Sequence, residues 1–371
     1  MMTLKAKIYE ATALLSTKAL EENFRRLYEA AGLDAKSVFA LVKANAYGHG
    51  ASEVAERLYR IGARRFAVAR LCEAREIREV VADSEILILA PTSAELTPSL
   101  LEGDFTQSVN SLAYANELAK RVPSGSRLKI AIAVDTGMGR LGFPAVFSDP
   151  TEEILAVAAN DRLHATSIYT HLPDADVEGG LAEQSVGIFR RQLNRLSERG
   201  LSLPSHFANS ASILLFGKAA QPLIRPGLSL YGYNPAPHLT EPRLLPVMRL
   251  LAPVLQIREF TPGETVGYCR TYRIDAPTRV ALLGIGYADG FLRTCSGATV
   301  TINGAPCRII GRISMDLTSV AIPDGLSIAV GDAAVIFGDN QEQLLSLSEH
   351  AKTIPNELLA GITSRVKRLW V

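Results

Sequence analysis

The first two-thirds of the chain alternate between short apolar runs and longer segments with apolar residues at helical spacing. Residues 17–31, for example, place Leu20, Phe24 and Leu27 on one helical face. Further helices are expected at 52–61, 73–81, 111–121, about 151–160 and 181–199. The runs typical of buried strands lie at 38–42, 65–70, 86–90, 106–109, 128–134, 165–170, 205–208 and 223–225.

This alternation predicts parallel strands joined by crossover helices, which is an α/β fold. About eight such units fit in residues 12–240, so we expect a (β/α)8 TIM barrel. A doubly wound sheet is the alternative. No G-x-G-x-x-G dinucleotide fingerprint follows the first strand, which weakens that alternative.

The pattern changes near residues 234–246, where N-P-A-P-H-L-T-E-P-R-L-L-P contains four prolines. We place the domain boundary here. The segments beyond it are short and rich in β-branched residues, and Asn303-Gly304 between two of them is a strong hairpin signal. The sequence thus predicts a smaller, mainly β domain over 241–371, which an N-terminal strand within 1–11 joins.

Composition limits the classes of function. With 371 residues the chain is long enough for about two domains. Its 39 basic and 38 acidic residues argue against nucleic acid or an anionic membrane as a partner. The four cysteines form no C-x-x-C pair, so we expect no metal site. The start of the chain lacks the apolar core of a signal peptide, and no apolar run approaches a membrane span, so a cytoplasmic location is expected.

The most informative residue is Lys43, which ends the apolar run 38–42 and opens the loop A-N-A-Y-G-H-G. Partial desolvation of a lysine lowers its pKa and favours the neutral, nucleophilic amine that a Schiff-base lysine needs. The plain alternative is a basic residue whose charged end reaches solvent from a strand end. The position of Lys43 alone favours this alternative. The residues around Lys43 favour the Schiff-base lysine instead.

Other polar residues follow the ends of predicted strands, and in a barrel all of these would gather at one face. The small-residue loop 206–212 has backbone N–H groups and a Ser210 hydroxyl that suit a phosphate. Gly227 allows a ligand to approach the backbone closely, although a plain turn after Pro226 explains it equally well. The residues after strand ends are Lys43, Tyr47, 135–140, His171, Asn209, Ser210 and Arg225.

The string V-K-A-N-A-Y-G-H-G resembles the pyridoxal-phosphate (PLP) lysine motif of the bacterial alanine racemases. The resemblance continues, in the order of the family, from residue 40 to about residue 365. Its further motifs are D-T-G-M-G-R-L-G at 135–142, Y-T-H at 169–171, H-F-A-N-S at 206–210, R-P-G-L-S-L-Y-G at 225–232, V-G-Y-C-R-T-Y at 266–272, I-G-Y-A-D-G at 285–290 and G-R-I-S-M-D at 311–316.

The resemblance implies a PLP enzyme that interconverts L- and D-alanine by a two-base mechanism and supplies D-alanine for peptidoglycan. Lys43 would hold PLP and act as one base, and Tyr268 of the partner subunit would act as the other. Because a tyrosine pKa near 10 makes a poor base, it needs a cationic neighbour, which His171 and Arg225 would supply. Arg140 would bind the substrate carboxylate, and Met315 and Asp316 would line the substrate site. The implied cofactor-binding residues are Lys43, Tyr47, His171, Asn209, Ser210, Arg225 and Gly227.

Two further implications concern assembly and reaction choice. The β domain of one subunit would complete the barrel site of the other, so a homodimer is expected. Arg225 would face the pyridine nitrogen of PLP. A guanidinium only donates hydrogen bonds, so that nitrogen would stay unprotonated and withdraw electrons less strongly, which would suppress transamination.

The sequence departs from the family pattern at two positions. Many relatives carry a carbamylated lysine two residues before the D-T-G-M loop, where this chain has Ala133; we hypothesise that a small anion such as chloride takes its place beside Arg140. Ser364 stands where relatives often have a phosphate-binding tyrosine. A broad-specificity or serine-accepting racemase of the same fold stays an alternative, as do a decarboxylase, a non-catalytic PLP-binding protein and an inactive scaffold.

Overall fold

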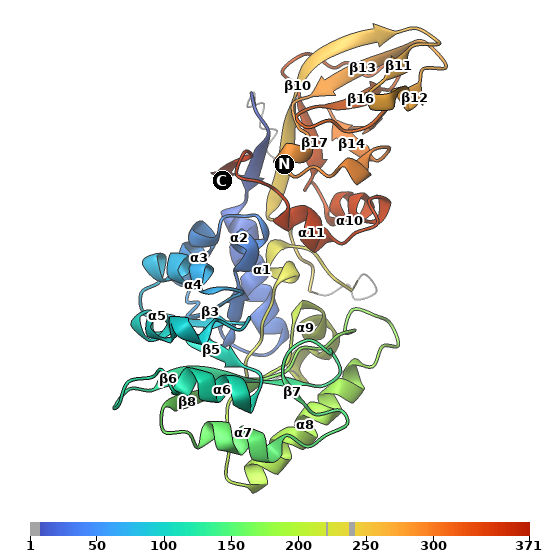
Figure 1. Cartoon of the computed structure of the whole chain (residues 1–371). Helices are drawn as coiled ribbons and strands as arrows, with labels where there is room; N and C mark the ends of the chain where they lie inside the picture. Colours follow the sequence, from blue (N-terminus) through green and yellow to red (C-terminus); the bar gives the residue numbers. More distant parts are fainter. Residues whose placement is uncertain (1–7, 220–221, 237–241) are drawn as a thin grey trace.

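The computed structural model describes residues 8–219, 222–236 and 242–371. Two regions follow one another along the chain, a barrel surrounded by helices and a β-rich C-terminal region (Figure 1). The barrel strands run parallel in the order β2-β3-β4-β5-β6-β8-β9. Their bounds are β2 Phe39–Leu41, β3 Arg65–Val68, β4 Glu85–Ile88, β5 Thr106–Val109, β6 Leu128–Asp135, β8 Leu163–Tyr169 and β9 Ser205–His206.

An eighth, very short strand position closes the barrel. Ile224 forms a parallel bridge with Val38, and its carbonyl accepts a hydrogen bond of 2.8 Å from the Phe39 N–H. On its other side the Arg225 N–H donates to the Ala208 carbonyl at 2.8 Å, which joins this segment to the strand that ends at His206. The predicted TIM barrel, followed by a mainly β region, is therefore confirmed.

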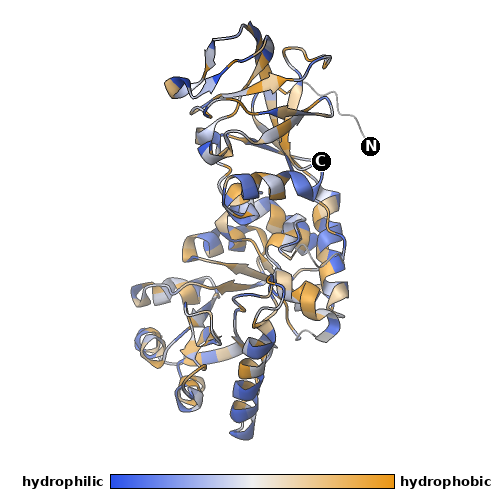
Figure 2. Ribbon diagram, turned by 90° about the vertical axis from the view of Figure 1, so that its right-hand side faces the viewer, coloured by the Kyte–Doolittle hydropathy of each residue, from blue (hydrophilic) through white to orange (hydrophobic). Residues whose placement is uncertain are grey.

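Amphipathic helices cover the barrel (Figure 2). The first of them begins after Ser16, whose hydroxyl accepts a hydrogen bond from the Ala19 N–H, and it buries Leu20, Phe24 and Leu27 as the pattern predicts. The helices are α1 Thr17–Ala30, α2 Lys43–Tyr47, α3 Ala51–Arg60, α4 Leu71–Val80, α5 Thr97–Glu102, α6 Leu112–Ala119, α7 Thr151–Ala158, α8 Ala182–Glu198 and α9 Ser210–Phe216. Neither α5 nor α9 was predicted, because both are too short to show a clear period.

The C-terminal region is built on a second, mostly antiparallel sheet. Asn303 and Gly304 both have positive φ, 50° and 82°, as the predicted two-residue hairpin between β14 and β15 requires. Two helices, α10 Gln341–His350 and α11 Pro355–Ala360, were not predicted. The strands are β10 Met248–Phe260, β13 Thr278–Leu283, β14 Thr299–Ile302, β15 Ala305–Arg308, β16 Thr318–Ile322, β17 Ala333–Phe337 and β18 Lys367–Trp370.

The N-terminal segment enters this second sheet. Strand β1 Thr12–Leu15 pairs antiparallel with β10 and parallel with β18. Residues 1–7 of the expected N-terminal strand lie outside the described residues, and the domain limits 12–240 and 241–371 stay a prediction. Small elements complete the fold: β7 Phe143–Pro144, β11 Thr265–Val266, β12 Tyr272–Arg273, η1 Ala35–Ser37, η2 Ala94–Leu96, η3 Gly217–Ala219, η4 Leu228–Tyr231, η5 Tyr268–Arg270, η6 Tyr287–Asp289 and η7 Arg293–Cys295.

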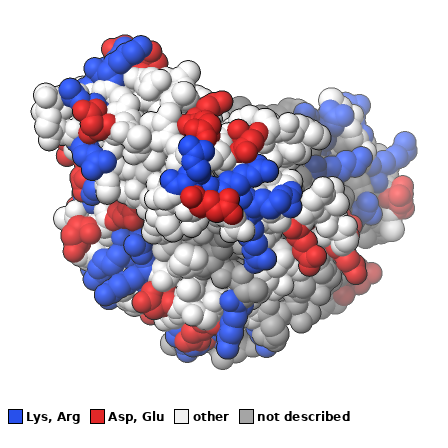
Figure 3. Space-filling model, turned by 90° about the horizontal axis from the view of Figure 1, so that it is seen from below, with Lys and Arg blue, Asp and Glu red and all other residues white. Residues whose placement is uncertain are grey.

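Three observations concern the surface charge, the length of the helices and possible metal sites. Lysine and arginine side chains are interspersed with aspartate and glutamate on the face shown in Figure 3. No helix in the described part of the chain has both the length and the apolar character that crossing a bilayer requires. Within those same residues, no group of three or more His, Cys, Asp or Glu side chains is arranged to hold a metal ion.

Candidate active site

A cavity of about 290 Å³ lies at the C-terminal ends of the barrel strands. It draws together residues that are far apart in sequence, because parallel strands end at the same face of a barrel. Among its lining residues are Lys43, Arg140, His171, Asn209 and Arg225, all of which were predicted as site residues. The barrel therefore gathers a lysine, two arginines and a histidine around one space.

Lys43 begins an unusual turn. The four residues after it, Ala44 to Tyr47, all have positive φ, between 51° and 54°. Left-handed backbone costs a non-glycine residue roughly 1–2 kcal/mol, so such a turn persists only where its surroundings enforce it. We predicted a loop here, and the structure has a left-handed helical turn closed by the Ala46 N–H, which donates to the Val42 carbonyl at 2.9 Å.

Contacts from both regions hold the end of this turn. The buried His49 ring lies with Nδ1 3.0 Å from the Ala46 carbonyl and 2.9 Å from the Tyr47 carbonyl. From β18 in the C-terminal region, Arg368 Nε donates to the Gly48 carbonyl at 2.7 Å. A Cβ on Gly48 would lie 2.1 Å from the Leu359 carbonyl oxygen of α11, so this position requires glycine. The C-terminal region thus packs directly against the lysine turn.

The surroundings of Lys43 favour its neutral amine. Burial lowers the pKa of Lys43, and the positive charge of Arg140 lowers it further, while Glu73 opposes both. A lysine with a lowered pKa is a better nucleophile and a better base near neutral pH. The structure therefore supports the reactive interpretation of Lys43 over that of an ordinary surface lysine.

Arg225 is a buried cation whose hydrogen-bond partners, within the described part of the chain, are all uncharged. It is 3% exposed and donates to the Thr170 carbonyl at 2.6 Å and the His206 carbonyl at 2.9 Å. Its guanidinium carbon lies 4.9 Å from the centre of the Tyr169 ring. Burial lowers the pKa of Arg225 to about 10, so it stays protonated at neutral pH. A buried guanidinium with spare donors is suited to an acceptor atom in the cavity.

The same contacts determine the tautomer of His206. A guanidinium N–H of Arg225 also donates to His206 Nδ1, which must then be unprotonated. The ring proton is on Nε2, 3.2 Å from the Ser167 hydroxyl. The His206 ring stacks on Tyr169 with centroids 5.1 Å apart. We did not single out His206 in the sequence, where it appears only as the first residue of the proposed phosphate loop.

His171 lines the cavity in its neutral form. Burial and the nearby charges of Arg225, Arg140 and Lys43 lower the pKa of His171 to about 3. In the single chain, therefore, the positive charge that we expected from His171 and Arg225 together resides on Arg225. A neutral imidazole can still accept a proton on one nitrogen and donate one from the other.

Tyr47, Ser210 and Gly227 lie together next to the cavity. The Ser210 hydroxyl oxygen accepts hydrogen bonds from the N–H groups of Gly227 at 2.9 Å and Ser229 at 3.1 Å. A Cβ on Gly227 would lie 2.5 Å from the Tyr47 hydroxyl, so glycine at this position lets that hydroxyl lie close to the backbone. Asn209 is the N-cap of α9, and its side-chain oxygen accepts the Ser212 N–H at 3.0 Å. Hydroxyl groups and a cradle that a side chain would fill suit an anionic group.

The arginine loop has its own internal support. Asp135 Oδ1 accepts the N–H groups of Gly137 at 2.9 Å and Gly139 at 3.1 Å, which shapes the turn that presents Arg140. Ala133, two residues before Asp135, is 2% exposed and lies level with Tyr169 across β6 and β8. The side chain of Ala133 is a methyl group, so this position carries no negative charge.

The predicted residues of the C-terminal region lie elsewhere. Tyr268, in η5 between β11 and β12, is 63% exposed, and Met315 is 52% exposed. Asp316 is also exposed and accepts a hydrogen bond of 2.7 Å from Arg365. These three residues do not line the barrel cavity of their own chain. Ser364 is exposed as well.

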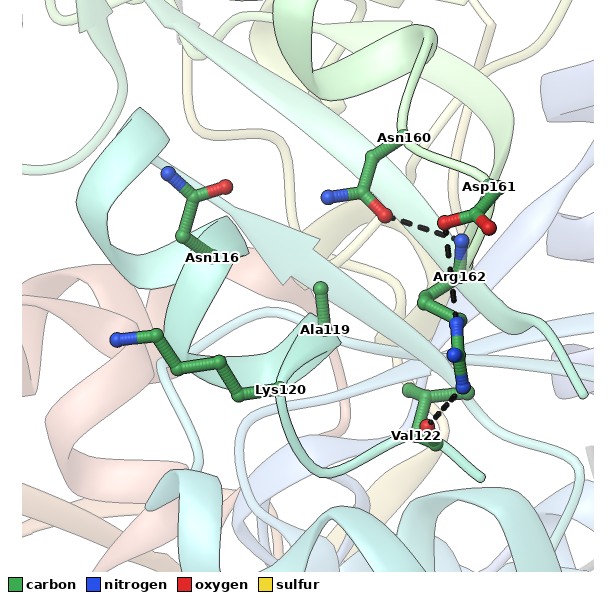
Figure 4. A pocket seen from close by; sticks show the side chains of 7 residues that line it. All are labelled: Asn116, Ala119, Lys120, Val122, Asn160, Asp161 and Arg162. Atoms are coloured by element: carbon green, nitrogen blue, oxygen red, sulfur yellow. Dashed lines mark hydrogen bonds and ion pairs between the residues drawn. The ribbon is translucent and has the colours of Figure 1, made fainter. Parts of the chain in front are cut away.

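A second, larger hollow of about 470 Å³ lies at the opposite end of the barrel (Figure 4). It is lined by the end of α6 and by residues 160–162, which precede β8. Arg162 lies along its wall, where it donates to the Val122 carbonyl at 2.9 Å. Because strand N-termini in a barrel usually carry stabilising contacts, we attribute a structural role to this hollow.

Comparison with known proteins identifies the family. The family model "Alanine racemase, N-terminal domain" matches residues 15–235, and "Alanine racemase, C-terminal domain" matches residues 247–370. The chain belongs to the alanine racemase family. An alanine racemase of Desulforamulus reducens is 34% identical over 97% of this chain and 98% of its own length. The predictions that the chain belongs to this family and is an amino-acid racemase are confirmed.

Solved structures of alanine racemases agree with the fold. That of the Clostridium difficile 630 protein has a TM-score of 0.90 at 28% identity and covers 98% of this chain and 96% of its own. The Bartonella henselae alanine racemase, described with covalently bound pyridoxal phosphate, has a TM-score of 0.88 at 29% identity and covers 98% of this chain and 100% of its own.

Proposed function

We propose that this alanine racemase family member binds PLP in the barrel cavity and interconverts L- and D-alanine through two bases, Lys43 and Tyr268. The observation that carries the proposal is the pairing, in one cavity, of a lysine whose pKa is lowered with a buried arginine that no carboxylate of the described residues neutralises. The first group is ready to bond a carbonyl carbon, and the second is ready to donate to a ring nitrogen.

The residues present fit PLP. Lys43 would bond its aldehyde carbon, and Arg225 would donate a hydrogen bond to its pyridine nitrogen. Tyr47, Ser210 and the backbone around Gly227 would hold its phosphate, where Gly227 leaves the space that a Cβ would fill. Asn209 and His171 would line the remaining cavity wall. When bound, PLP withdraws electron density from the α-carbon of the amino acid and so makes its proton acidic.

The chain's own residues would orient the substrate and move the proton. Arg140 would bind the carboxylate of alanine, from the loop that Asp135 shapes. Once the substrate amine has replaced it on the cofactor, the free Lys43 amine would take or return the α-proton on one face of the α-carbon. Each positioned proton transfer contributes roughly 10²–10⁴-fold in rate. Inversion of configuration requires a second base on the opposite face.

Tyr268 of the partner subunit would be that second base. Within one chain Tyr268 is exposed and does not line the cavity, so a second copy must supply it if it acts there. The partner's Met315 and the partner's Asp316 would contribute to the substrate site. His171, neutral and next to the charge of Arg225, would stabilise the deprotonated phenol by donating a hydrogen bond.

The wider role follows from the reaction. We propose a homodimer in the cytoplasm that makes D-alanine for peptidoglycan, with neither nucleic acid nor a membrane as a partner. Chloride beside Arg140 would compensate for the missing negative group at Ala133. Crystals grown in bromide should then show an anomalous peak next to Arg140, and the absence of such a peak would disprove this detail.

Incubation with PLP and L-alanine in D2O tests the proposed reaction directly. We expect D-alanine with deuterium at the α-carbon, because the two faces are served by different bases and one exchanges with solvent. Deuterium in L-alanine without D-alanine would mean that one base works alone, which would contradict the role of Tyr268. Absence of both signals would contradict the proposed substrate.

A further inference from the structure

The Glu73 carboxylate joins the lysine turn to the end of the neighbouring strand. Glu73 lies in the first turn of α4, directly after β3. Its Oε1 accepts the N–H of Ala44, the residue after Lys43, at 2.6 Å. Its Oε2 accepts the N–H groups of Ala69 at 2.8 Å and Arg70 at 3.0 Å. One carboxylate therefore holds three backbone N–H groups at the rim of the cavity, where Lys43 and Ala69 both line the wall.

These hydrogen bonds have a specific task in a left-handed turn. The first N–H groups of any helical turn have no acceptor within the turn and need one from outside. Here the backbone from Ala44 to Tyr47 is also strained, so contacts must hold it in place. A hydrogen bond to an ionised acceptor is roughly twice as strong as one between neutral groups. Glu73 thus fixes the strained turn at its first residue, next to the reactive amine.

The charge of Glu73 has a second effect. The charged and titratable groups that act on Lys43 are Arg140, His171 and Glu73. Arg140 is positive and His171 is neutral at pH 7, so Glu73 is the negative member of this group. Without it, burial and Arg140 would act on the amine unopposed.

We propose that Glu73 is a positioning residue for Lys43, which orients the lysine turn through the Ala44 N–H and supplies the negative charge that balances Arg140. The proposal deepens the proposed function and rests on it for the role of Lys43. It also assigns Glu73 a task that its place in an ordinary first helical turn does not require, because capping α4 needs only the Ala69 and Arg70 contacts.

The Glu73→Gln variant tests the charge and does not depend on catalysis. The rate at which acetic anhydride labels Lys43 is followed against pH in the full chain after removal of PLP, with mass spectrometry of the Lys43 peptide. We expect the midpoint of labelling to fall by about half a unit to one unit relative to the wild type. Glu76→Gln is the matched control on the same helix, where Glu76 accepts a hydrogen bond from the Ser52 hydroxyl at 2.9 Å, and its midpoint should not move.

The Glu73→Asp variant separates position from charge. Aspartate keeps the charge but is one methylene shorter, so it retains the α4 contacts and loses the Ala44 N–H. We expect a labelling midpoint near that of the wild type together with a kcat about tenfold lower at similar KM, because a displaced amine is poorly aligned. If Glu73→Gln does not fold, this variant decides the question through kcat and PLP affinity.

Two results would overturn the proposal. One is that the pH midpoint of Lys43 labelling shifts equally in Glu73→Gln and Glu76→Gln, or shifts in neither variant. The other is a Glu73→Asp enzyme with unchanged kcat and PLP affinity. The labelling result does not bear on whether the enzyme racemises alanine, since the amine is labelled without substrate, whereas the kcat of Glu73→Asp is interpreted only if the wild type racemises alanine.

Discussion

The barrel and the C-terminal region contribute very different groups to the proposed site. In the barrel, Arg225 is buried and hydrogen-bonded to His206 and Thr170, and Lys43 starts a strained turn that neighbours hold on several sides. In the C-terminal region, Tyr268 and Met315 are exposed. One half of the site is assembled within the chain, and the other half presents its groups to solvent.

This difference indicates how the two halves meet. A buried network needs its geometry fixed before any ligand arrives, because an unpaired polar group inside a protein is costly. Exposed aromatic and sulfur-containing side chains instead suit contact with another surface. Tyr287 and Met315, both exposed, lie on adjoining segments, since the Tyr287 N–H donates to the Ser314 carbonyl at 3.1 Å. We infer that the C-terminal groups function against the barrel of a second copy.

The largest effects should come from removing either proposed base. Lys43→Ala and Tyr268→Phe should each lower the racemisation rate by about 10²–10⁴-fold or more, because each removes a proton transfer. Tyr268→Phe should leave the unfolding temperature nearly unchanged, since it removes only a hydroxyl and the side chain is exposed within its own chain. Initial rates in both directions and thermal unfolding measure these effects. Full activity in either variant would refute its role.

The next largest effect should appear when a buried arginine and an exposed one are each replaced by lysine. Arg225→Lys should lower kcat about 10²-fold by displacing the donor that faces the cofactor, and should destabilise the fold by about 1–3 kcal/mol through lost hydrogen bonds. Arg258→Lys is the control, because Arg258 is exposed and stacks on Phe260 in the C-terminal region. Equal effects in the two variants would contradict the assignment of Arg225.

Acid should destabilise the barrel before the C-terminal region. Burial lowers the pKa of His49 to about 4 and that of His171 to about 3, and it lowers the pKa of His206 well below 6.5. Below pH 6.5 the unfolded chain therefore binds protons that the folded chain does not, and stability falls by up to about 1.4 kcal/mol per pH unit for each histidine.

Urea unfolding between pH 7 and pH 5, combined with hydrogen exchange, would locate this loss of stability. Protection should fall first in the barrel strands around His206. Stability that does not change over this range would contradict the neutral state of the buried histidines.

The smallest effect should come from the contact between the two regions at the lysine turn. Arg368→Met removes the hydrogen bond to the Gly48 carbonyl, together with those to three carbonyls of its own region (Ile362, Thr363 and Val366), and should cost about 1–3 kcal/mol in stability and a few-fold in kcat. Lys367→Met, at an exposed neighbouring position, should change neither quantity. Unfolding curves and steady-state rates of both variants decide the matter, and an unaffected Arg368→Met enzyme would show that the turn does not need this support.

Much of the fold was predictable because its signals are local and periodic. The strands around the barrel are apolar runs bounded by polar residues, and the Asn303-Gly304 hairpin follows from turn chemistry. Other features depend on partners distant in sequence. Contacts from Glu73, His49 and Arg368 hold the left-handed turn after Lys43, and in A-N-A-Y only the asparagine is of a type that adopts positive φ readily.

The site was predictable where a motif names its residues. Lys43, Arg140, His171, Asn209 and Arg225 stand in recognisable strings, and the cavity gathers all five. His206 and Glu73 escaped notice because their importance lies in what they contact. His206 is only the first residue of a predicted phosphate loop, and Glu73 only follows a strand-end arginine by three residues. Without the fold, both are weak signals.

Mixing two inactive variants would test the shared site most directly. Lys43→Ala and Tyr268→Phe chains are unfolded together in equal amounts, refolded with PLP and assayed for racemisation. If each site combines Lys43 of one chain with Tyr268 of the other, half of the dimers are mixed and carry one intact site, so about a quarter of wild-type activity should return. Activity no higher than that of the separate variants would contradict a site shared between two copies.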